Sequence, residues 1–260
     1  MTHSDTQTAL VTGASSGIGA QLARQFATDG YDVVLTARRR ARLETLAEDL
    51  ESTHGVSASV YTADLADPDA PAALADELAD AEIEIDALVN NAGFSSHGRF
   101  DQTSLSTDLD MIQVNLVALT ELTKRFAKPM VERGHGEILN TASMAAMAPT
   151  PKLAVYAATK SYVLSFTEAI ADELEAAGVT VSALCPGPVD TELVSLDGMD
   201  GSGAADQRLN DPESVARAGY RGLKNGKRII VPSMRMKALA QATRVLPRNR
   251  VVSIAGSFYD

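Results

Sequence analysis

Cysteine and histidine are scarce in this chain of 260 residues. Its one cysteine, Cys185, cannot form an intramolecular disulfide. Because no histidine lies nearby in the sequence to activate the thiol, we interpret Cys185 as a small apolar strand residue and not as a nucleophile. The four histidines lack the spacing of metal ligands, so we expect solvated loop side chains and no metal site. They are His3, His54, His97 and His135.

Positive charge and long apolar runs are also in short supply. The 23 basic residues face 34 acidic ones, which leaves a net charge of −11. This balance argues against non-specific binding of nucleic acid, or of an anionic membrane, by the whole surface. The negative net charge fits the surface charge that keeps ordinary proteins soluble, or an adaptation to high salt. No apolar run is as long as a membrane span, and residues 1–7 lack the apolar core of a signal peptide. We therefore expect a cytoplasmic protein with no integral membrane segment.

What the sequence does have is a regular alternation of short β-branched runs and longer stretches. Residues 20–28 and 42–50, for example, carry apolar side chains at helical spacing. Strand–helix–strand alternation predicts crossovers and a mainly parallel sheet that is covered on both faces. The length suits a single domain over residues 1–260. The apolar runs lie at residues 9–11, 33–35, 60–61, 87–89, 138–139, 179–184 and 229–231.

One segment, residues 188–211, breaks this rhythm. It holds Gly198, Gly201 and Gly203, several acidic residues and little periodicity. It follows the sixth predicted strand, at the carboxyl edge where the ligands of such sheets bind. We interpret it as a substrate loop that acts as a lid, with a passive insertion as the alternative.

A glycine-rich turn follows the first predicted strand and opens the first helix. Its glycines have the pattern Gly-x-x-x-Gly-x-Gly, and no lysine follows the last of them, which argues against an ATP or GTP P-loop. Glycines let a backbone approach a pyrophosphate closely, and the free N–H groups of a helix N-terminus bind that anion. The turn therefore predicts a dinucleotide site, and a purely structural turn is the alternative. The predicted contacts are Gly13, Ser15, Ser16, Gly17, Ile18 and Gly19.

The end of the second predicted strand indicates which dinucleotide binds. An acidic residue about 20 positions beyond the glycines would bond the ribose 2′-hydroxyl of NAD. This chain instead has Ala37 followed by Arg38, Arg39 and Arg40. A guanidinium can hold a 2′-phosphate with paired N–H donors, so we expect Arg38 to contact NADP. Arg40, and in part Arg39, fit a solvated helix start.

Three polar residues further along the chain form a candidate proton-transfer group. Tyr156 and Lys160 are four residues apart on a predicted helix and therefore share one face. A lysine cation beside a tyrosine favours the phenolate, which would prepare Tyr156 for proton exchange near neutral pH. Ser143, at the end of the fifth strand, could polarise a substrate carbonyl. A tyrosine and a lysine at this spacing are also common on ordinary helices.

The sequence resembles the short-chain dehydrogenase/reductase family along nearly its whole length. The resemblance implies a Rossmann-type, doubly wound α/β fold with about seven parallel strands. It also implies an NADP(H)-dependent oxidoreductase that interconverts a carbonyl and an alcohol, as a homodimer or homotetramer. The matching motifs are Thr12–Gly19, Asp64-Leu65, Asn90-Asn91-Ala92-Gly93, the tetrad Asn115, Ser143, Tyr156 and Lys160, and Pro186-Gly187 with Thr191.

The resemblance also implies a role for each matching residue. Tyr156 exchanges the proton on oxygen, and Lys160 tunes Tyr156 and holds the nicotinamide ribose. Ser143 positions the carbonyl, and Asn115 supports a water-mediated proton relay from Lys160. The cofactor contacts that it implies include Tyr156 and Lys160 themselves. The further ones are Asp64, Leu65, Asn91, Ala92, Gly93, Pro186, Gly187, Val189 and Thr191.

The substrate itself does not follow from the motifs, because the family accepts many carbonyl compounds on one scaffold. We expect a moderately apolar pocket wall from residues 144–153 and the 188–211 loop. A catalytically silent NADP-binding regulator is the alternative function, and a lyase or epimerase on the same scaffold is a third. The side chains expected in the wall are Met144, Met147, Pro149, Leu193 and Val194.

The last part of the chain has a charge asymmetry. Between Ser214 and Tyr259 there is no acidic residue, whereas ten basic residues occur there. Apolar side chains from Met234 to Leu246 recur at helical spacing, so we expect a basic helix at about residues 233–247. Its cations could neutralise the acidic body or a neighbouring subunit. Binding an anionic handle on the substrate, such as a phosphopantetheine carrier or coenzyme A, and contact with an anionic membrane are the alternatives.

Overall fold

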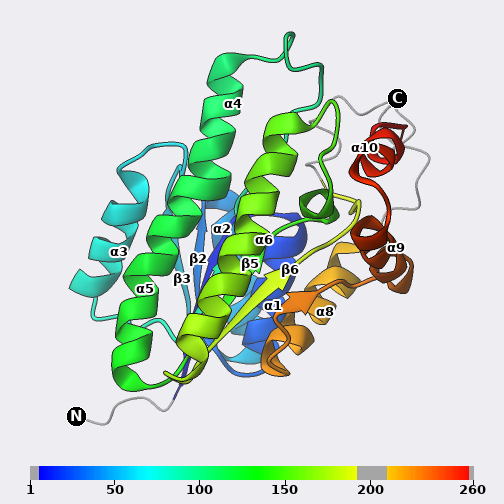
Figure 1. Cartoon of the computed structure of the whole chain (residues 1–260). Helices are drawn as coiled ribbons and strands as arrows, with labels where there is room; N and C mark the ends of the chain where they lie inside the picture. Colours follow the sequence, from blue (N-terminus) through cyan, green and yellow to red (C-terminus); the bar gives the residue numbers. More distant parts are fainter. Residues whose placement is uncertain (1–5, 192–209, 258–260) are drawn as a thin grey trace.

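A single parallel sheet forms the centre of the protein (Figure 1). The computed structural model describes residues 6–191 and 210–257. The strand order is β3-β2-β1-β4-β5-β6-β7, and every neighbouring pair is parallel. All seven apolar runs predicted as strands are strands, which confirms the doubly wound fold. Their bounds are β1 Thr8–Thr12, β2 Asp32–Ala37, β3 Ala58–Thr62, β4 Ala87–Asn90, β5 Gly136–Thr141, β6 Val179–Leu184 and β7 Ile229–Ile230.

Helices cover both faces of the sheet because successive strand residues point to opposite sides. On β1, for example, Ala9 and Val11 pack into one apolar cluster and Leu10 into the other. The first cluster lies under α1, α2 and α8, and the second under α3, α5 and α6. The bounds are α1 Gly17–Thr28, α2 Arg40–His54, α3 Ala70–Asp80, α4 Leu105–Ile112, α5 Leu119–Arg133, α6 Ala154–Glu175 and α8 Pro212–Lys224.

The strand order reverses between β1 and β4, which are neighbours in the sheet although β2 and β3 separate them in sequence. The chain therefore leaves β1 and β4 on opposite faces and opens a crevice at their carboxyl ends, where the ligands of such sheets bind. Two short helical turns lie at this edge. A π-helical turn, Gln113–Ala118, joins α4 to α5, and a 3₁₀ turn, Met144–Met147, follows β5. π-helical turns often mark functional sites.

Two helices close the chain beside the carboxyl edge (Figure 1). They are α9, Met234–Val245, and α10, Arg248–Ser257, so the predicted basic helix is confirmed. The side chains that α9 buries differ in part from the expected set, which began with Met234. Met234 is 77% exposed, whereas Met236 packs over Gly187. No helix in the described ranges is both long and apolar enough to cross a membrane.

Some cations of the basic end, residues 214–259, neutralise acidic side chains in the rest of the domain. Lys224 Nζ lies 2.6 Å from Glu137 Oε2 and donates a hydrogen bond to the Tyr31 hydroxyl. The Lys224 ammonium also lies 4.4 Å from the Tyr31 ring centroid. Arg228 lies within 3.0 Å of carboxylate oxygens on α6. These pairs fix α8 and β7 to the rest of the domain, as the neutralisation interpretation expects.

Candidate active site

The glycine turn forms one end of a cavity of about 440 Å³ at the carboxyl ends of the strands, here called the catalytic cavity. Gly13 has φ +67°, and a Cβ there would come within 2.8 Å of Ala92 Cα. Gly17 has φ +54° and begins α1. The backbone therefore passes close to the loop after β4 and presents the start of α1 to the cavity, as an anion site requires.

Gly19 has a different use from the one predicted. A Cβ at this position would lie 2.3 Å from the Gly13 carbonyl oxygen and 2.5 Å from Asn91 Nδ2. Gly19 is also absent from the lining of the catalytic cavity, whereas Gly13, Ser15, Ser16, Gly17 and Ile18 all line it. The missing side chain at Gly19 therefore allows α1 to pack closely against the glycine turn. Gly19 supports the turn and does not face the cavity.

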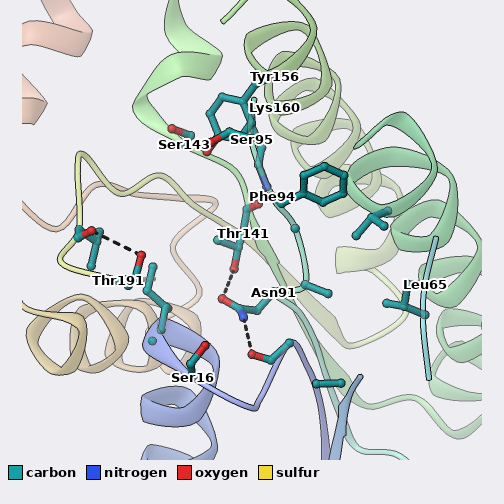
Figure 2. A pocket seen from close by; sticks show the side chains of 18 of the residues that line it. Ser16, Leu65, Asn91, Phe94, Ser95, Thr141, Ser143, Tyr156, Lys160 and Thr191 are labelled. Carbon is teal, nitrogen blue, oxygen red and sulfur yellow. Dashed lines mark hydrogen bonds between the residues drawn. The ribbon is translucent and has the colours of Figure 1, made fainter. Parts of the chain in front are cut away.

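Side chains at the ends of β1, β4 and β5 join these strands by hydrogen bonds. Thr12 Oγ1 accepts hydrogen bonds from the N–H groups of Asn91 and Ala92, both at 3.0 Å. Asn91 Nδ2 donates to the Thr12 carbonyl at 3.2 Å. Figure 2 shows Thr141 Oγ1 donating to Asn91 Oδ1 at 3.4 Å and Asn91 Nδ2 donating to the Gly13 carbonyl at 3.5 Å. Asn91 therefore lines the catalytic cavity and also links the strand ends that form its floor.

The arginines after β2 divide into two groups. Arg38 and Arg39 both line the catalytic cavity, and the contact of Arg38 with NADP stays a prediction. Arg39 also donates hydrogen bonds to Ser15 Oγ at 2.9 Å and to Ser16 Oγ at 2.8 Å. Arg40 lies outside the lining and pairs with Glu44 at 3.1 Å, as a solvated helix start should. The sequence interpretation placed Arg39 in part at a solvated helix start, whereas its side chain bonds the glycine turn. The pattern of a helix start does not show in which direction a long side chain points.

Ser143, Tyr156 and Lys160 gather at the other end of the catalytic cavity (Figure 2). β5 ends at Thr141, two residues before the predicted position, and Ser143 instead caps the 3₁₀ turn. Its Oγ accepts a hydrogen bond from the Ala145 N–H at 3.1 Å, so its hydroxyl proton can still be donated to a ligand. Tyr156 lies in the first turn of α6.

Lys160 is almost completely buried between α6 and β5. Its Nζ donates a hydrogen bond to the Thr141 carbonyl at 2.8 Å and lies 5.8 Å from the Tyr156 ring centroid. Burial lowers the pKa of Lys160 to about 8, and the Cys185 thiolate form would oppose this shift. Burial raises the pKa of Cys185 to about 12, which keeps its thiol protonated and fits the predicted structural role.

Asn115 lies behind the catalytic cavity and not in its lining. Its Oδ1 accepts a hydrogen bond from the Phe94 N–H at 3.1 Å, and its Nδ2 donates to the Phe94 carbonyl at 2.9 Å. Nδ2 also lies 3.2 Å from Thr159 Oγ1. A Cβ on Gly93 would lie 2.8 Å from Asn115 Oδ1 and 3.3 Å from Lys160 Nζ. Asn115 therefore positions the loop after β4 beside Lys160.

The remaining predicted contacts all line the catalytic cavity. Nothing in the sequence pattern singled out Phe94, Ser95 or Asp110, which line it too. Ser95 is buried, and it lies beside Tyr156 and Ser143 in Figure 2. It follows the Asn90–Gly93 motif by two residues, and this proximity was the only available signal. The remaining predicted contacts are Asp64, Leu65, Asn91, Ala92, Gly93, Pro186, Gly187, Val189 and Thr191.

The predicted pocket wall needs a correction. Met144 lines the catalytic cavity, but Met147 and Pro149 line a different cavity, on the far side of the same segment. The cause is the 3₁₀ turn, which directs neighbouring side chains to different sides. Leu193 and Val194, with residues 192–209 of the substrate loop, lie outside the described residues. The two ends of that loop are joined by a bridge between Val189 and Asn210.

None of the described basic residues between Ser214 and Tyr259 lines the catalytic cavity. The described part of the structure therefore gives no support to the interpretation that they hold an anionic handle on the substrate. It also contains no group of three or more His, Cys, Asp or Glu side chains that could hold a metal ion.

Replacing Lys160 with methionine is expected to remove a pH dependence of stability. The folded-state pKa of about 8 lies below the ordinary 10.5, so the folded chain binds fewer protons than the unfolded chain between these values. The free energy of unfolding should therefore rise with pH across this window. The rise due to Lys160 is roughly 3 kcal/mol, at about 1.4 kcal/mol per pH unit. Urea unfolding across the window measures it.

The matched control for this prediction is Lys124→Met on the exposed surface of α5, which should keep the rise. At the acid end of the window Lys160→Met should be the more stable protein, because the cost of burying a cation is absent. A stability difference between Lys160→Met and the parent that stays constant with pH would contradict the assignment.

Comparison with known proteins gives a consistent family. A family model described as short chain dehydrogenase matches residues 7–199. "Probable oxidoreductase EphD" of Mycobacterium tuberculosis is 32% identical over 254 residues, which cover 92% of this chain and 43% of that protein. The chain thus spans less than half the length of this relative. "Ketoacyl reductase HetN" of Nostoc is 32% identical over 225 residues, which cover 86% of this chain and 78% of that protein.

Solved structures agree with this comparison. A short-chain dehydrogenase from Sphingobium yanoikuyae, in complex with NADPH, superposes with a TM-score of 0.83 at 33% identity, over 92% of this chain and 94% of that one. An alcohol dehydrogenase specific for bulky-bulky ketones, from Comamonas testosteroni, has a TM-score of 0.80 at 29% identity, with 93% of each chain covered.

Proposed function

Because this chain belongs to the short-chain dehydrogenase/reductase family, we propose that it transfers a hydride between NADP(H) and a carbonyl or alcohol substrate, with Tyr156 as the general acid and base. One observation carries the proposal. The glycine turn and the group Ser143, Tyr156 and Lys160 line the same cavity, from its opposite ends. A dinucleotide anchored at the turn would extend toward Tyr156.

The residues of the catalytic cavity fit such a cofactor. A Cβ at Gly13 or Gly93 would enter space bounded by backbone or by buried polar groups, so these positions leave room only for glycine. Ser16 caps α1 without a side-chain bond to the helix, which leaves the first N–H groups of α1 available to a pyrophosphate. When bound, NADP(H) supplies or accepts the hydride.

In the direction of reduction, the Tyr156 hydroxyl donates its proton to the substrate oxygen. The Ser143 hydroxyl donates a hydrogen bond to the same oxygen and so favours the developing negative charge. Lys160, as a cation, then stabilises the tyrosinate that remains. Asn115 acts indirectly, because its amide holds the Phe94 backbone and thereby the loop next to Lys160.

The proposed preference for NADP(H) rests on the two arginines in the lining. Arg38 and Arg39 both come from the end of β2, where the adenine ribose binds in such folds. The contacts of Arg39 with Ser15 and Ser16 place its guanidinium beside the turn. A 2′-phosphate between these cations would receive charge-assisted hydrogen bonds. The neighbour from Sphingobium yanoikuyae, solved with NADPH, is consistent with this choice.

The test of the proposal is a panel of carbonyl compounds with NADPH, followed at the absorbance of the reduced nicotinamide. The panel should include bulky-bulky ketones and ketoacyl compounds, the substrate classes that the names of two relatives contain. We expect turnover of at least one class. Tight NADPH binding with no turnover on any of them would favour a silent cofactor-binding regulator instead.

We also propose that the protein is a homodimer or homotetramer assembled through α4, α5 and α6. These helices carry exposed apolar side chains, with Leu105 72% exposed and Leu109 55% exposed. Tyr162 on α6 joins Thr120 on α5 through a 3.0 Å hydrogen bond, so the two helices present one continuous surface. Sedimentation should show multiples of 27.4 kDa at micromolar concentration. Leu109→Glu should shift the distribution toward smaller species, whereas a parent protein found only at 27.4 kDa would refute the assembly.

A further inference from the structure

A second cavity lies behind the catalytic one, between the 146–151 segment, α6 and the pair α9 and α10. Its volume is about 710 Å³, and among the described residues its lining shares none with that of the catalytic cavity. Small-molecule sites commonly occupy roughly 300–1,000 Å³. Nothing in the proposed reaction uses this space.

The walls of the second cavity are apolar and built from small side chains. Ala154 and Ala158 face it from α6, and Val251 and Val252 face it from α10. Alanines at the α6 positions leave a gap that a larger apolar residue would fill. Such a surface, made of methyl groups, suits an alkyl chain, because burying each CH₂ group is favourable.

Arg248, the first residue of α10, is the only charged side chain among the described residues of this lining. A cation in the first turn of a helix is disfavoured by the helix dipole, so helix stability does not explain it. Elsewhere in the basic end, Arg217, Lys224 and Arg228 pair with carboxylates. In the part of the chain that the structure describes, Arg248 has no such partner.

The sequence around Arg248 is also basic. No acidic residue occurs in the sequence between Ser214 and Tyr259, and Arg250 lies two positions further along α10. An apolar cavity whose wall carries a guanidinium with no carboxylate partner among the described residues is complementary to a molecule with an alkyl chain and an anionic head group.

The two cavities are separated by one wall, to which neighbouring residues of the same segments contribute on each side. Tyr156 and Lys160 line the catalytic cavity, and the next residues in the chain, Ala157 and Ser161, line the second one. Ser161 Oγ donates to the Ala146 carbonyl at 3.0 Å, which ties the 3₁₀ turn to α6. A ligand in the second cavity would therefore touch the segment that carries the proposed catalytic group.

We propose that the second cavity binds a monomeric single-chain amphiphile with a carboxylate head group. The alkyl chain lies against Ala154, Ala158 and Val251, and the carboxylate accepts hydrogen bonds from Arg248. This site goes beyond the proposed reaction and does not depend on it.

The test measures dodecanoate binding to the NADPH-loaded protein by isothermal titration, below the micelle concentration. Arg248→Gln should weaken binding by about tenfold or more, since a charge-assisted hydrogen bond is lost. Arg250→Gln, on the same helix but outside the lining, is the matched control and should bind as the parent does.

A second pair of variants tests the apolar part of the site. Ala158→Leu fills the cavity from an exposed position of α6, so the fold should tolerate it, and binding should weaken by a similar factor. Ser165→Leu adds the same bulk to an exposed part of α6 outside the lining and should have no effect. Because binding is the readout, the test is valid even if the panel of carbonyl compounds shows no turnover.

Three results would overturn the proposal. The first is dodecanoate affinity that neither Arg248→Gln nor Ala158→Leu changes. The second is equal affinity for dodecyltrimethylammonium, which would show that charge does not select the ligand. The third is attachment to phosphatidylglycerol vesicles without binding of monomeric dodecanoate, which would identify the basic end as a membrane-contact surface.

Discussion

Tyr156→Phe should lower turnover by about two to four orders of magnitude, the usual contribution of general acid–base catalysis. The substitution removes the hydroxyl that donates the proton and keeps the ring that lines the catalytic cavity. NADPH affinity, measured by fluorescence titration, should change little, because the proposed anchoring contacts lie at the glycine turn and at Arg38 and Arg39. The loss should therefore appear in kcat and not in cofactor binding.

The chain offers a matched control on the same helix. Tyr162 lies six residues further along α6, bonds Thr120, and has no part in the catalytic cavity. Tyr162→Phe should keep near-parental turnover. If Tyr156→Phe kept it as well, the proton would have to come from another group, and the proposed role of Tyr156 would be lost. Ser95, which is buried and lines the same cavity, would then be the next candidate.

The sequence was sufficient to predict the elements of this fold and most of the catalytic cavity. The reason is that both depend on periodicity and on short local motifs. Alternating apolar runs determine the strands, and the carboxyl edge of a parallel sheet then collects the residues that follow them. Ser143, Tyr156 and the glycine turn are distant in sequence, yet each follows a strand or opens a helix at that edge.

What the sequence could not predict depends on the direction of individual side chains. Arg39 and Arg40 are neighbours of similar chemistry, but only Arg39 folds back onto Ser15 and Ser16. Met147 looks equivalent to Met144, but the 3₁₀ turn places the two side chains in different cavities. Likewise, helical spacing selected Met234 for burial on α9, whereas Met236 packs over Gly187. Tertiary contacts, which no local pattern contains, decide each of these cases.

The parent protein is expected to prefer NADPH over NADH, and Ala37→Asp combined with Arg38→Leu should reverse the preference. The new carboxylate would bond a ribose 2′-hydroxyl and repel a 2′-phosphate, while the loss of the guanidinium removes a phosphate contact. A charge-assisted pair of this kind contributes roughly 1.5–3 kcal/mol, or about ten- to a hundredfold in kcat/KM. The measurement is kcat/KM for both cofactors with one fixed substrate.

Single variants separate the two arginines in the lining. Arg39→Leu removes the contacts with Ser15 and Ser16 and should weaken NADPH use, but without an acidic residue at position 37 it should not improve NADH use. Arg40→Leu, which breaks only the exposed pair with Glu44, is the control and should leave the ratio unchanged. Equal kcat/KM values for the two cofactors in the parent would contradict the proposed phosphate contact. If the preference for NADPH disappears in Arg39→Leu but persists in Arg38→Leu, the phosphate contact belongs to Arg39, which bonds the glycine turn. It then does not belong to Arg38, which its position in the sequence had indicated.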